Sequence, residues 1–331
     1  MLGVLYAALG AFTFALNNVA MRRGVVTGSV LQGMAMTVPI GGLSFLVLAT
    51  AFGELHEIPA FPAAAVIWLA GQGIVHFVLG RYCNYKSNQL MGVNLTAPVV
   101  QLQVPFAMLL AVAMLHEKFT VLQGVGSALM LGGSFITQAN DGKGRRDPAT
   151  ASAPKPTFQP RILPGYILGL GAAMCYGASP LMARQAFLYA PGIGTAAGGC
   201  IAYAAATLFF LLILLKPGSL ADIRSTKREN LPWFLASAVL VAISQAFVYA
   251  SLAVAPLMVV TPILQLSLVF RLFLSQLINR EHEVMNAAVV IGAFTAVLGS
   301  LLVSIDTDAL TRLLDLPSAL AAFLDYHLAG R

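Results

Sequence analysis

One apolar stretch occurs twice in this sequence, 164 residues apart, and each copy ends in a glutamate. Residues 96–117 and 260–281 align without a gap, and shorter matches precede them in the same order. Repetition of this kind predicts a molecule made of two related halves. The identical pairs in the long stretch are Pro98 and Pro262, Gln101 and Gln265, Leu102 and Leu266, Phe106 and Phe270, Leu110 and Leu274, and Glu117 and Glu281.

The repeated stretches belong to a chain that is too apolar for a water-soluble protein. Of its 331 residues, 58% are hydrophobic and only 10% are charged, and residues 87–116 carry no Asp, Glu, Lys or Arg. Soluble domains are roughly 45–50% apolar and about 25% charged. An apolar run of about 20 residues crosses the ~30 Å hydrocarbon layer of a lipid bilayer. The sequence therefore predicts a polytopic membrane protein that is entirely α-helical.

Ten membrane spans are expected, five in each half of the chain. Because five is an odd number, the second half enters the membrane from the opposite side, which makes the two halves inverted repeats. Asn84 to Gly92, like Arg22 to Gly24, is expected to interrupt the helices. The predicted spans are 2–21, 30–52, 62–83, 92–115, 119–138, 163–188, 194–215, 231–254, 257–278 and 284–305.

The two halves, 1–138 and 163–305, are separated by a segment of different composition. Residues 139–162 are rich in Pro, Gly and basic residues, and such a segment cannot bury a core, so we expect a flexible linker. Residues 306–331 mix leucines with charged residues. They are expected to form an amphipathic tail on the membrane surface or a soluble tail without a role.

The first half contains a motif that resembles the EamA-type transporters of the drug/metabolite transporter superfamily. The residues His116-Glu117-Lys118-Phe119-Thr120, followed by Gln123 and Gly126, are similar to the family pattern Gly-Glu-x-x-Thr/Ser-x-x-Gln-x-x-Gly. His116 replaces the usual Gly, and the second copy is looser. The resemblance implies ten helices in two five-helix repeats and a transporter in the inner (plasma) membrane.

The distribution of Lys and Arg predicts the orientation of the chain in the membrane. The face that carries the chain termini holds four of these residues, and the opposite face holds fourteen. Cytoplasmic loops carry the excess of Lys and Arg, so both termini are expected outside. The resemblance implies the opposite, because ten-helix members of the family are usually described with both termini inside.

Sequence motifs for other activities are missing. The chain shows no ATP-binding loop, no hydrolase motif and no cysteine–histidine metal cluster, so we expect no cofactor. The net charge of +6 lies in short loops, which indicates membrane orientation and no nucleic-acid partner. No acid lies inside a span, which disfavours proton-coupled export of cations. The oligomeric state does not follow from the sequence.

Polar residues inside the predicted spans are the candidates for a substrate-binding site. Each has a structural alternative, because interhelical hydrogen bonds use the same residue types. Tyr85 and Tyr249 are related by the repeat, as are Gln101 and Gln265, and prolines one turn earlier are expected to open the helix at the glutamines. The candidates are Asn18, Gln72, His76, Tyr85, Gln101, Tyr176, Gln245, Tyr249, Gln265 and Arg271.

Two other pairs of charged residues are related by the repeat. Arg22 and Arg184 are expected either to face a shared cavity or to reach the lipid headgroups from the helix ends. Glu117 and Glu281 are expected to have structural roles at helix ends.

Together these features favour a secondary transporter that moves a small polar metabolite by alternating access. Because arginines but no acidic residues lie within the predicted spans, the expected substrate is an amino acid or an organic acid. The transport is expected to be efflux or exchange. One alternative is an intramembrane enzyme or flippase that acts on a lipid-linked substrate, with His76 as the base of the enzyme. The other is a partner subunit that transports nothing.

Overall fold

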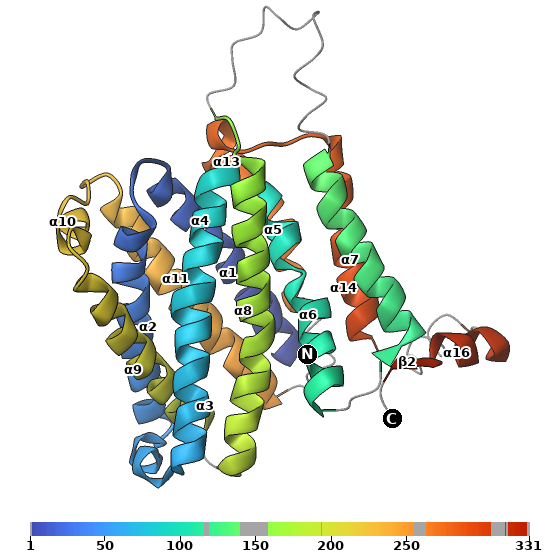
Figure 1. Ribbon diagram of the computed structural model, residues 1–331, viewed down its shortest axis with the longest axis horizontal. Helices are drawn as coiled ribbons and strands as arrows, with labels where there is room; N and C mark the ends of the chain where they lie inside the picture. The colour runs from blue at the N-terminus through green and yellow to red at the C-terminus, as the bar shows by residue number, and fades with distance from the viewer. Residues whose placement is uncertain are drawn as a thin grey trace, which may run out of the picture.

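The computed structural model describes residues 2–115, 119–139, 158–192, 194–254, 263–305, 315 and 317–329. These residues form a helical bundle (Figure 1). Seven helices are long and apolar enough to cross a membrane, and three shorter apolar helices, Val121–Thr137, Ser267–Ile278 and Ala287–Val303, complete the ten expected spans. The predicted fold class, an all-α polytopic membrane protein, is confirmed.

The first half of the chain forms spans one to five. The third and fourth spans each consist of more than one helical segment. A short 3₁₀ helix, η1 (Leu55–Ala60), joins the second span to the third. The segments in chain order are α1 (Leu2–Thr27), α2 (Val30–Ala51), α3 (Ala63–Gly73), the π-helix η2 (Ile74–Gly80), α4 (Arg81–Met91), α5 (Val93–Val100), α6 (Gln103–Leu115), strand β1 (Phe119–Thr120) and α7 (Val121–Ala139).

The second half forms spans six to ten and a short C-terminal segment. The helices that form these spans are α8 (Ile162–Tyr189), α9 (Thr195–Leu214), α11 (Leu231–Val254), α13 (Ser267–Ile278) and α14 (Ala287–Ser304). The remaining elements are α10 (Ser219–Arg224), η4 (Arg280–His282), α16 (Ser318–Leu324) and strand β2 (His327–Ala329).

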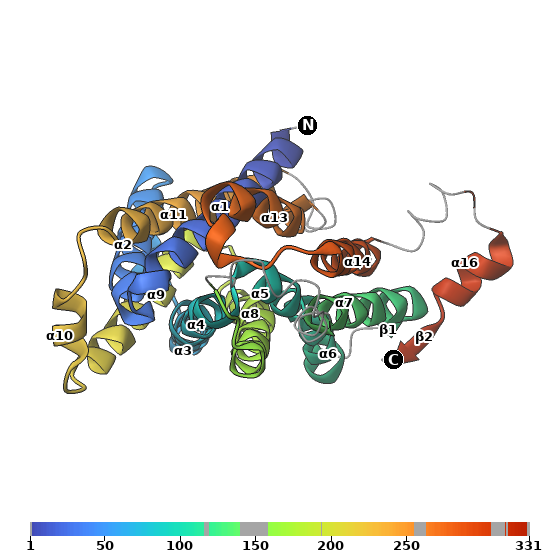
Figure 2. The same ribbon diagram turned by 90° about the horizontal axis from the view of Figure 1, so that it is seen from above.

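The helices pair as an inverted repeat requires. Helix α1 of the first half packs on α11, the third span of the second half, and α8 packs reciprocally on α3 and α4. The second spans of the two halves, α2 and α9, contact each other, as do the fifth spans, α7 and α14 (Figure 2). Exchanging the two halves therefore leaves the pattern of contacts unchanged, which is the signature of a pseudo-twofold axis.

The contact between α7 and α14 is built from glycines. A Cβ atom added to Gly133 would lie 2.5 Å from the carbonyl oxygen of Gly292, and one added to Gly126 would lie 2.6 Å from that of Gly299. Cβ atoms added to Gly292 and Gly299 of α14 would lie equally close to the carbonyl oxygens of Gly133 and Gly126. Small residues at these positions let the two backbones approach each other, as is typical of packed helices in membranes.

The third span is longer than predicted, and the expected interruption from Asn84 to Gly92 is wrong. Helix α4 continues to Met91 and ends at Gly92, where φ is +86°. Several polar side chains of α4 are buried between neighbouring helices: Ser87 Oγ donates to the carbonyl of Gly165, and Asn84 donates to Asn18. The expected interruption at Arg22 to Gly24 is also wrong, because α1 continues to Thr27.

A π-helical segment, η2, lies in the middle of the third span and contains His76. Gly73 precedes it and packs against the backbone of α9, so that an added Cβ would clash with the carbonyl of Ala202. Such wide turns inside α-helices are often found at functional sites.

The fourth and ninth spans are broken at the repeated glutamines. Turns occupy Gln101–Leu102 and Gln265–Leu266. The backbone hydrogen bond from Val104 N to Gln101 O has its counterpart between Leu268 N and Gln265 O, and both N–O distances are 3.1 Å. The regular α-helical pattern is thus interrupted by tight turns at the predicted positions; Pro262 lies outside the described residues.

The predicted linker and tail are only partly within the described residues. Of the linker, residues 140–157 lie outside them, as do residues 306–314 of the tail. Helix α16 lies apart from the bundle and exposes Leu320 and Phe323 (Figure 2). Strand β2 pairs antiparallel with β1, so the tail is attached to the connection before α7.

Candidate functional site

A cavity of about 210 Å³ lies between the two halves of the molecule, at the two helix breaks. It is bounded by α1, by the break between α5 and α6, by α11, and by the start of α13. It is therefore enclosed by spans one, four, eight and nine, all of which the sequence had suggested. The lining residues are Gly10, Ala11, Phe14, Val100, Gln101, Gln103, Ser244, Gln245, Val248, Leu264, Gln265, Ser267 and Arg271.

Four predicted site residues meet at this cavity: Gln101, Gln245, Gln265 and Arg271. Gln101 and Gln265 occupy equivalent places in the two repeats, and both are buried. The Gln101 Oε1 atom has no hydrogen-bond partner within the described residues. Glutamine amides carry both donors and acceptors, so this cluster can bind neutral polar groups as well as ionised ones.

Arg271 supplies the positive charge of the cavity. Its side chain is 4% exposed, its guanidinium lies 5.0 Å from the centre of the Phe14 ring, and its Nε atom has no hydrogen-bond partner within the described residues. Among the described residues, no carboxylate forms an ion pair with it. A buried cation without a counter-ion is costly in a membrane, and an anionic group in the cavity would offset that cost.

Small, apolar and polar residues that were not among the predicted site residues line the rest of the cavity. Gly10 lies where α1 and α11 are in close contact, and its carbonyl accepts a hydrogen bond of 3.0 Å from Ser244 Oγ. Gln103 and Ser267 contribute from the segments that follow the two helix breaks. Among these additional lining residues, only Ser267 carried a sequence signal for the site, because it lies two residues after Gln265.

Three other predicted residues, His76, Tyr85 and Tyr176, form a second polar cluster outside the cavity lining. The rings of His76 and Tyr176 lie 4.7 Å apart, and the His76 Nδ1 atom has no hydrogen-bond partner in the described part of the chain. Tyr85 is buried, and its hydroxyl group is also unpaired there. We call this group, together with Arg81 and Tyr203, the aromatic cluster.

Arg81 is the charged member of the aromatic cluster. Its Nη1 atom donates to the carbonyl oxygen of Thr37 over 3.0 Å, and Nη2 donates to the Tyr203 hydroxyl over 3.1 Å. The guanidinium also lies over the rings of Phe77 and Tyr203. Arg81 lies near the end of the predicted span 62–83, and the structure buries it inside the third span, because helix α4 continues to Met91.

The remaining predicted site residues lie elsewhere. Asn18 donates to the Phe14 carbonyl, and its Oδ1 atom accepts from Asn84 and Asn88. Gln72 donates to Ser179 Oγ over 2.9 Å. Both therefore connect neighbouring helices and do not line the cavity. The side chain of Tyr249 lies outside the described residues.

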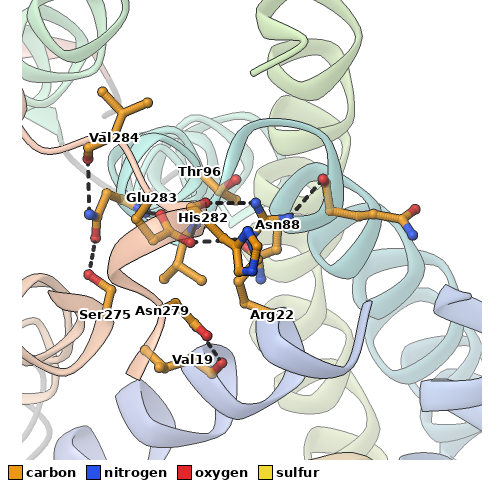
Figure 3. A network of polar contacts seen from close by, with 12 residues as sticks. Val19, Arg22, Asn88, Thr96, Ser275, Asn279, His282, Glu283 and Val284 are labelled. Atoms are coloured by element: carbon orange, nitrogen blue, oxygen red, sulfur yellow. Dashed lines mark hydrogen bonds and ion pairs between the residues drawn. The ribbon is translucent and has the colours of Figure 1, made fainter. Parts of the chain in front are cut away.

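A buried ion pair joins the two halves at the end of α1 that is remote from the cavity. Arg22 Nε lies 3.2 Å from Glu283 Oε1, and the side chains are 1% and 0% exposed (Figure 3). Two further Arg22 nitrogens donate to the backbone carbonyls of Gln89 and His282. Arg22 therefore neither faces the cavity nor reaches the headgroups. The side chain of its repeat partner Arg184 lies outside the described residues.

Glu283 also caps the first helix of the fourth span. Its two carboxylate oxygens accept hydrogen bonds from the backbone N–H groups of Val93 and Asn94, over 2.9 and 3.0 Å. Gly92 allows this approach, because a Cβ atom there would lie 2.6 Å from Glu283 Oε2. A carboxylate at a helix N-terminus is favoured by the free N–H groups and by the helix dipole.

Further hydrogen bonds complete a network around the ion pair. Ser275 Oγ donates to Asn94 Oδ1, Asn94 Nδ2 donates to the Val284 carbonyl, and Asn279 Nδ2 donates to the Val19 carbonyl (Figure 3). The Phe158 ring lies 4.4 Å from the Arg22 guanidinium. The network joins α1, α5, α13 and the connection to α14, and we call it the Arg22–Glu283 lock.

Burial and the charges of the lock shift the pKa values of two residues, Glu283 and His282, in the connection between α13 and α14. Burial raises the pKa of Glu283, and the Arg22 charge and the two backbone N–H groups oppose this only in part. Burial and the positive charges of Arg22 and Arg23 lower the pKa of His282. His282 is therefore neutral at pH 7, and Arg22 is the cation of the lock.

The sequence did not single out Glu283. It named Glu117 and Glu281, because these two are related by the repeat. Glu281 is exposed, and Glu117 lies outside the described residues. The position equivalent to Glu283 in the first half is Phe119, so comparison of the two halves gives no indication that Glu283 is a buried acid. No group of three or more His, Cys, Asp and Glu residues suited to a metal ion occurs in the described ranges.

Comparisons with known proteins agree with this architecture. The family model of the EamA-like transporter family matches residues 1–138 and 163–305. One solved crystal structure covers 90% of this chain and 96% of its own chain, with a TM-score of 0.59 and 15% sequence identity, so the likeness concerns the fold alone. No curated protein matches the chain. The two matched regions coincide with the two five-helix halves, and the chain belongs to the EamA-like transporter family.

Proposed function

We propose that this membrane transporter moves a small polar metabolite with an acidic group, such as an amino acid or an organic acid, by alternating access. The observation that carries the proposal is Arg271, a buried cation that faces the cavity without a carboxylate partner in the described chain. A substrate carboxylate would supply the missing charge. The glutamines on either side would bind its remaining polar groups.

The two helix breaks support a substrate site at this place. At Gln101–Leu102 and Gln265–Leu266 the backbone leaves the regular helical pattern inside the membrane. Irregular backbone at this depth is tolerated where it is buried or lines a cavity, and secondary transporters place substrate sites at such breaks.

The Arg22–Glu283 lock supports alternating access. The cavity touches α1 at Gly10, Ala11 and Phe14, whereas the lock holds α1 at Arg22. Phe14 and Arg22 are eight residues apart, which is about 12 Å along a helix. The lock thus closes one side of the cavity, and a substrate can pass on that side only after the lock has opened.

We propose the inner membrane as the location, with both termini outside. In that orientation the Lys- and Arg-rich face is cytoplasmic. The lock lies on this face, where residues 158–161 lead into α8 (Figure 1). The structure would then represent the state that is closed toward the cytoplasm, and export would require the lock to open for loading.

Transport by the purified protein tests the proposal. Proteoliposomes would be assayed with a panel of radiolabelled amino acids and organic acids. We expect uptake of at least one acid to fall more than tenfold in Gln265→Ala and in Arg271→Gln. The exposed Arg224→Gln serves as the matched control and should transport normally. Wild-type uptake of no acid, or unchanged flux in both cavity variants, would refute the proposal.

A further inference from the structure

We propose that the aromatic cluster is a second binding site for an oxyanion, so that the transported metabolite carries two acidic groups. This inference rests on the transport function proposed above, and it assigns the substrate class. The first acidic group would bind Arg271 in the cavity, and the second would bind Arg81.

Arg81 is a buried cation with unused donors. It is 3% exposed and forms no ion pair with a carboxylate of the described chain. A guanidinium has five N–H donors, and two of the Arg81 donors are used, by the Thr37 carbonyl and the Tyr203 hydroxyl. A carboxylate or a phosphate matches the planar arrangement of the remaining donors.

The neighbours of Arg81 can also donate to an anion. The Tyr85 hydroxyl, the His76 Nδ1 atom and the Thr37 hydroxyl are buried and have no partner among the described residues. Hydroxyl and imidazole groups can each donate a hydrogen bond, whereas no acidic side chain of the described residues forms an ion pair with Arg81. A buried polar group without a partner is destabilising, and three such groups around one cation indicate a missing ligand.

Tyr176 connects the aromatic cluster to the cavity. Its ring packs on His76, and Tyr176 belongs to the same buried cluster as Val100, which lines the cavity. The aromatic cluster, which contains Arg81, thus adjoins the cavity that Arg271 lines, although the two arginines come from different halves of the molecule. A single small molecule with two acidic groups can offset both charges at once.

A lipid phosphate does not fit the aromatic cluster as well as a second substrate acid. On the lipid side, Tyr203 borders a groove of about 780 Å³ between α2, α3 and α9. The other residues of that groove are almost all apolar, so a charged headgroup could not pass along it without losing its hydration.

Binding of matched acids tests the second site. Malonate, succinate and glutarate would be compared with their monoamides, which are similar in size and carry one acid less. Affinities would be measured by calorimetry with the full-length protein in nanodiscs of neutral lipid. We expect at least one dicarboxylate to bind tenfold or more tightly than its monoamide, and Arg81→Gln to abolish this difference while the monoamide affinity stays within twofold.

A second variant, Tyr85→Phe, tests the second site if Arg81→Gln does not fold. Tyr85→Phe removes a donor but no charge, and it should weaken the dicarboxylate several-fold and the monoamide little. Arg224→Gln is the control. Equal affinity for each dicarboxylate and its monoamide, or an unchanged difference in Arg81→Gln and Tyr85→Phe, would overturn the second site and leave the proposed transport standing. If no acid of either kind binds and none is transported, both proposals fail.

Nanodiscs that contain an anionic phospholipid distinguish the source of the anion. If the lipid occupied the aromatic cluster, it would compete with the dicarboxylate, and the affinity would fall in wild type but not in Arg81→Gln. This result would overturn the assignment to the substrate. An unchanged wild-type affinity is expected.

Discussion

Single charged residues in this molecule differ in how their burial is compensated. Arg22 is matched by Glu283 and by two backbone carbonyls. Arg81 and Arg271 are buried to a similar degree, yet neither forms an ion pair within the described residues. Removing one partner of a buried pair leaves the other charge uncompensated, whereas a cation that is already unpaired can bind a ligand. The first arrangement suits a structural contact and the second a binding site.

Glu283→Gln should therefore destabilise the protein strongly. The variant leaves the Arg22 charge buried without its carboxylate and weakens the cap of α5, and we expect a loss of about 3 kcal/mol. Unfolding in mixed micelles would measure the loss. The neighbouring exposed Glu281→Gln is the matched control and should cost less than about 1 kcal/mol. A larger effect at Glu281 than at Glu283 would contradict the assignment of the lock.

At the scale of elements, the sequence predicted the spans and the two breaks, but not the contacts that depend on the packing of distant helices. Gln101 and Gln265 occupy equivalent positions of the repeated sequence, and both line the cavity. Asn84 was misassigned to a loop, because a polar residue buried between helices cannot be distinguished from an exposed one by composition. Tyr203 carried no signal, since its role depends on Arg81 from another helix.

The contact between α7 and α14 gives a prediction at this scale. Gly133→Ala places a Cβ atom 2.5 Å from the Gly292 carbonyl oxygen and should force the helices apart, at a cost of about 1–3 kcal/mol. Gly132→Ala is the matched control, because no atom of the described residues lies within 4 Å of the added Cβ atom. Alanine forms helices better than glycine, so Gly132→Ala should be neutral or stabilising. Thermal unfolding in detergent measures both, and equal stabilities would contradict the close packing.

For the whole molecule, the inverted repeat relates the observed state to a second one. Each half makes the same set of helix contacts with the other, so the proposed mechanism would exchange the conformations of the two halves and retain an equivalent packing. The lock makes the observed state asymmetric, because the position equivalent to Glu283 is Phe119. Under the proposed alternating access, we therefore expect the lock to bias the equilibrium toward closure on its own side.

Labelling of the cavity tests this bias directly. Ser267→Cys, in a variant whose three native cysteines are replaced by serine, would place a thiol in the cavity lining. A membrane-impermeant maleimide applied to oriented vesicles should label this thiol from the side opposite the lock. Adding Glu283→Gln should open access from the lock side and reduce labelling from the other side, because the two open states exclude each other in alternating access. Tagging the termini in the same vesicles identifies the side. Labelling that is unaffected by Glu283→Gln would show that the ion pair does not control access, and equal labelling from both sides in each variant would contradict alternation itself.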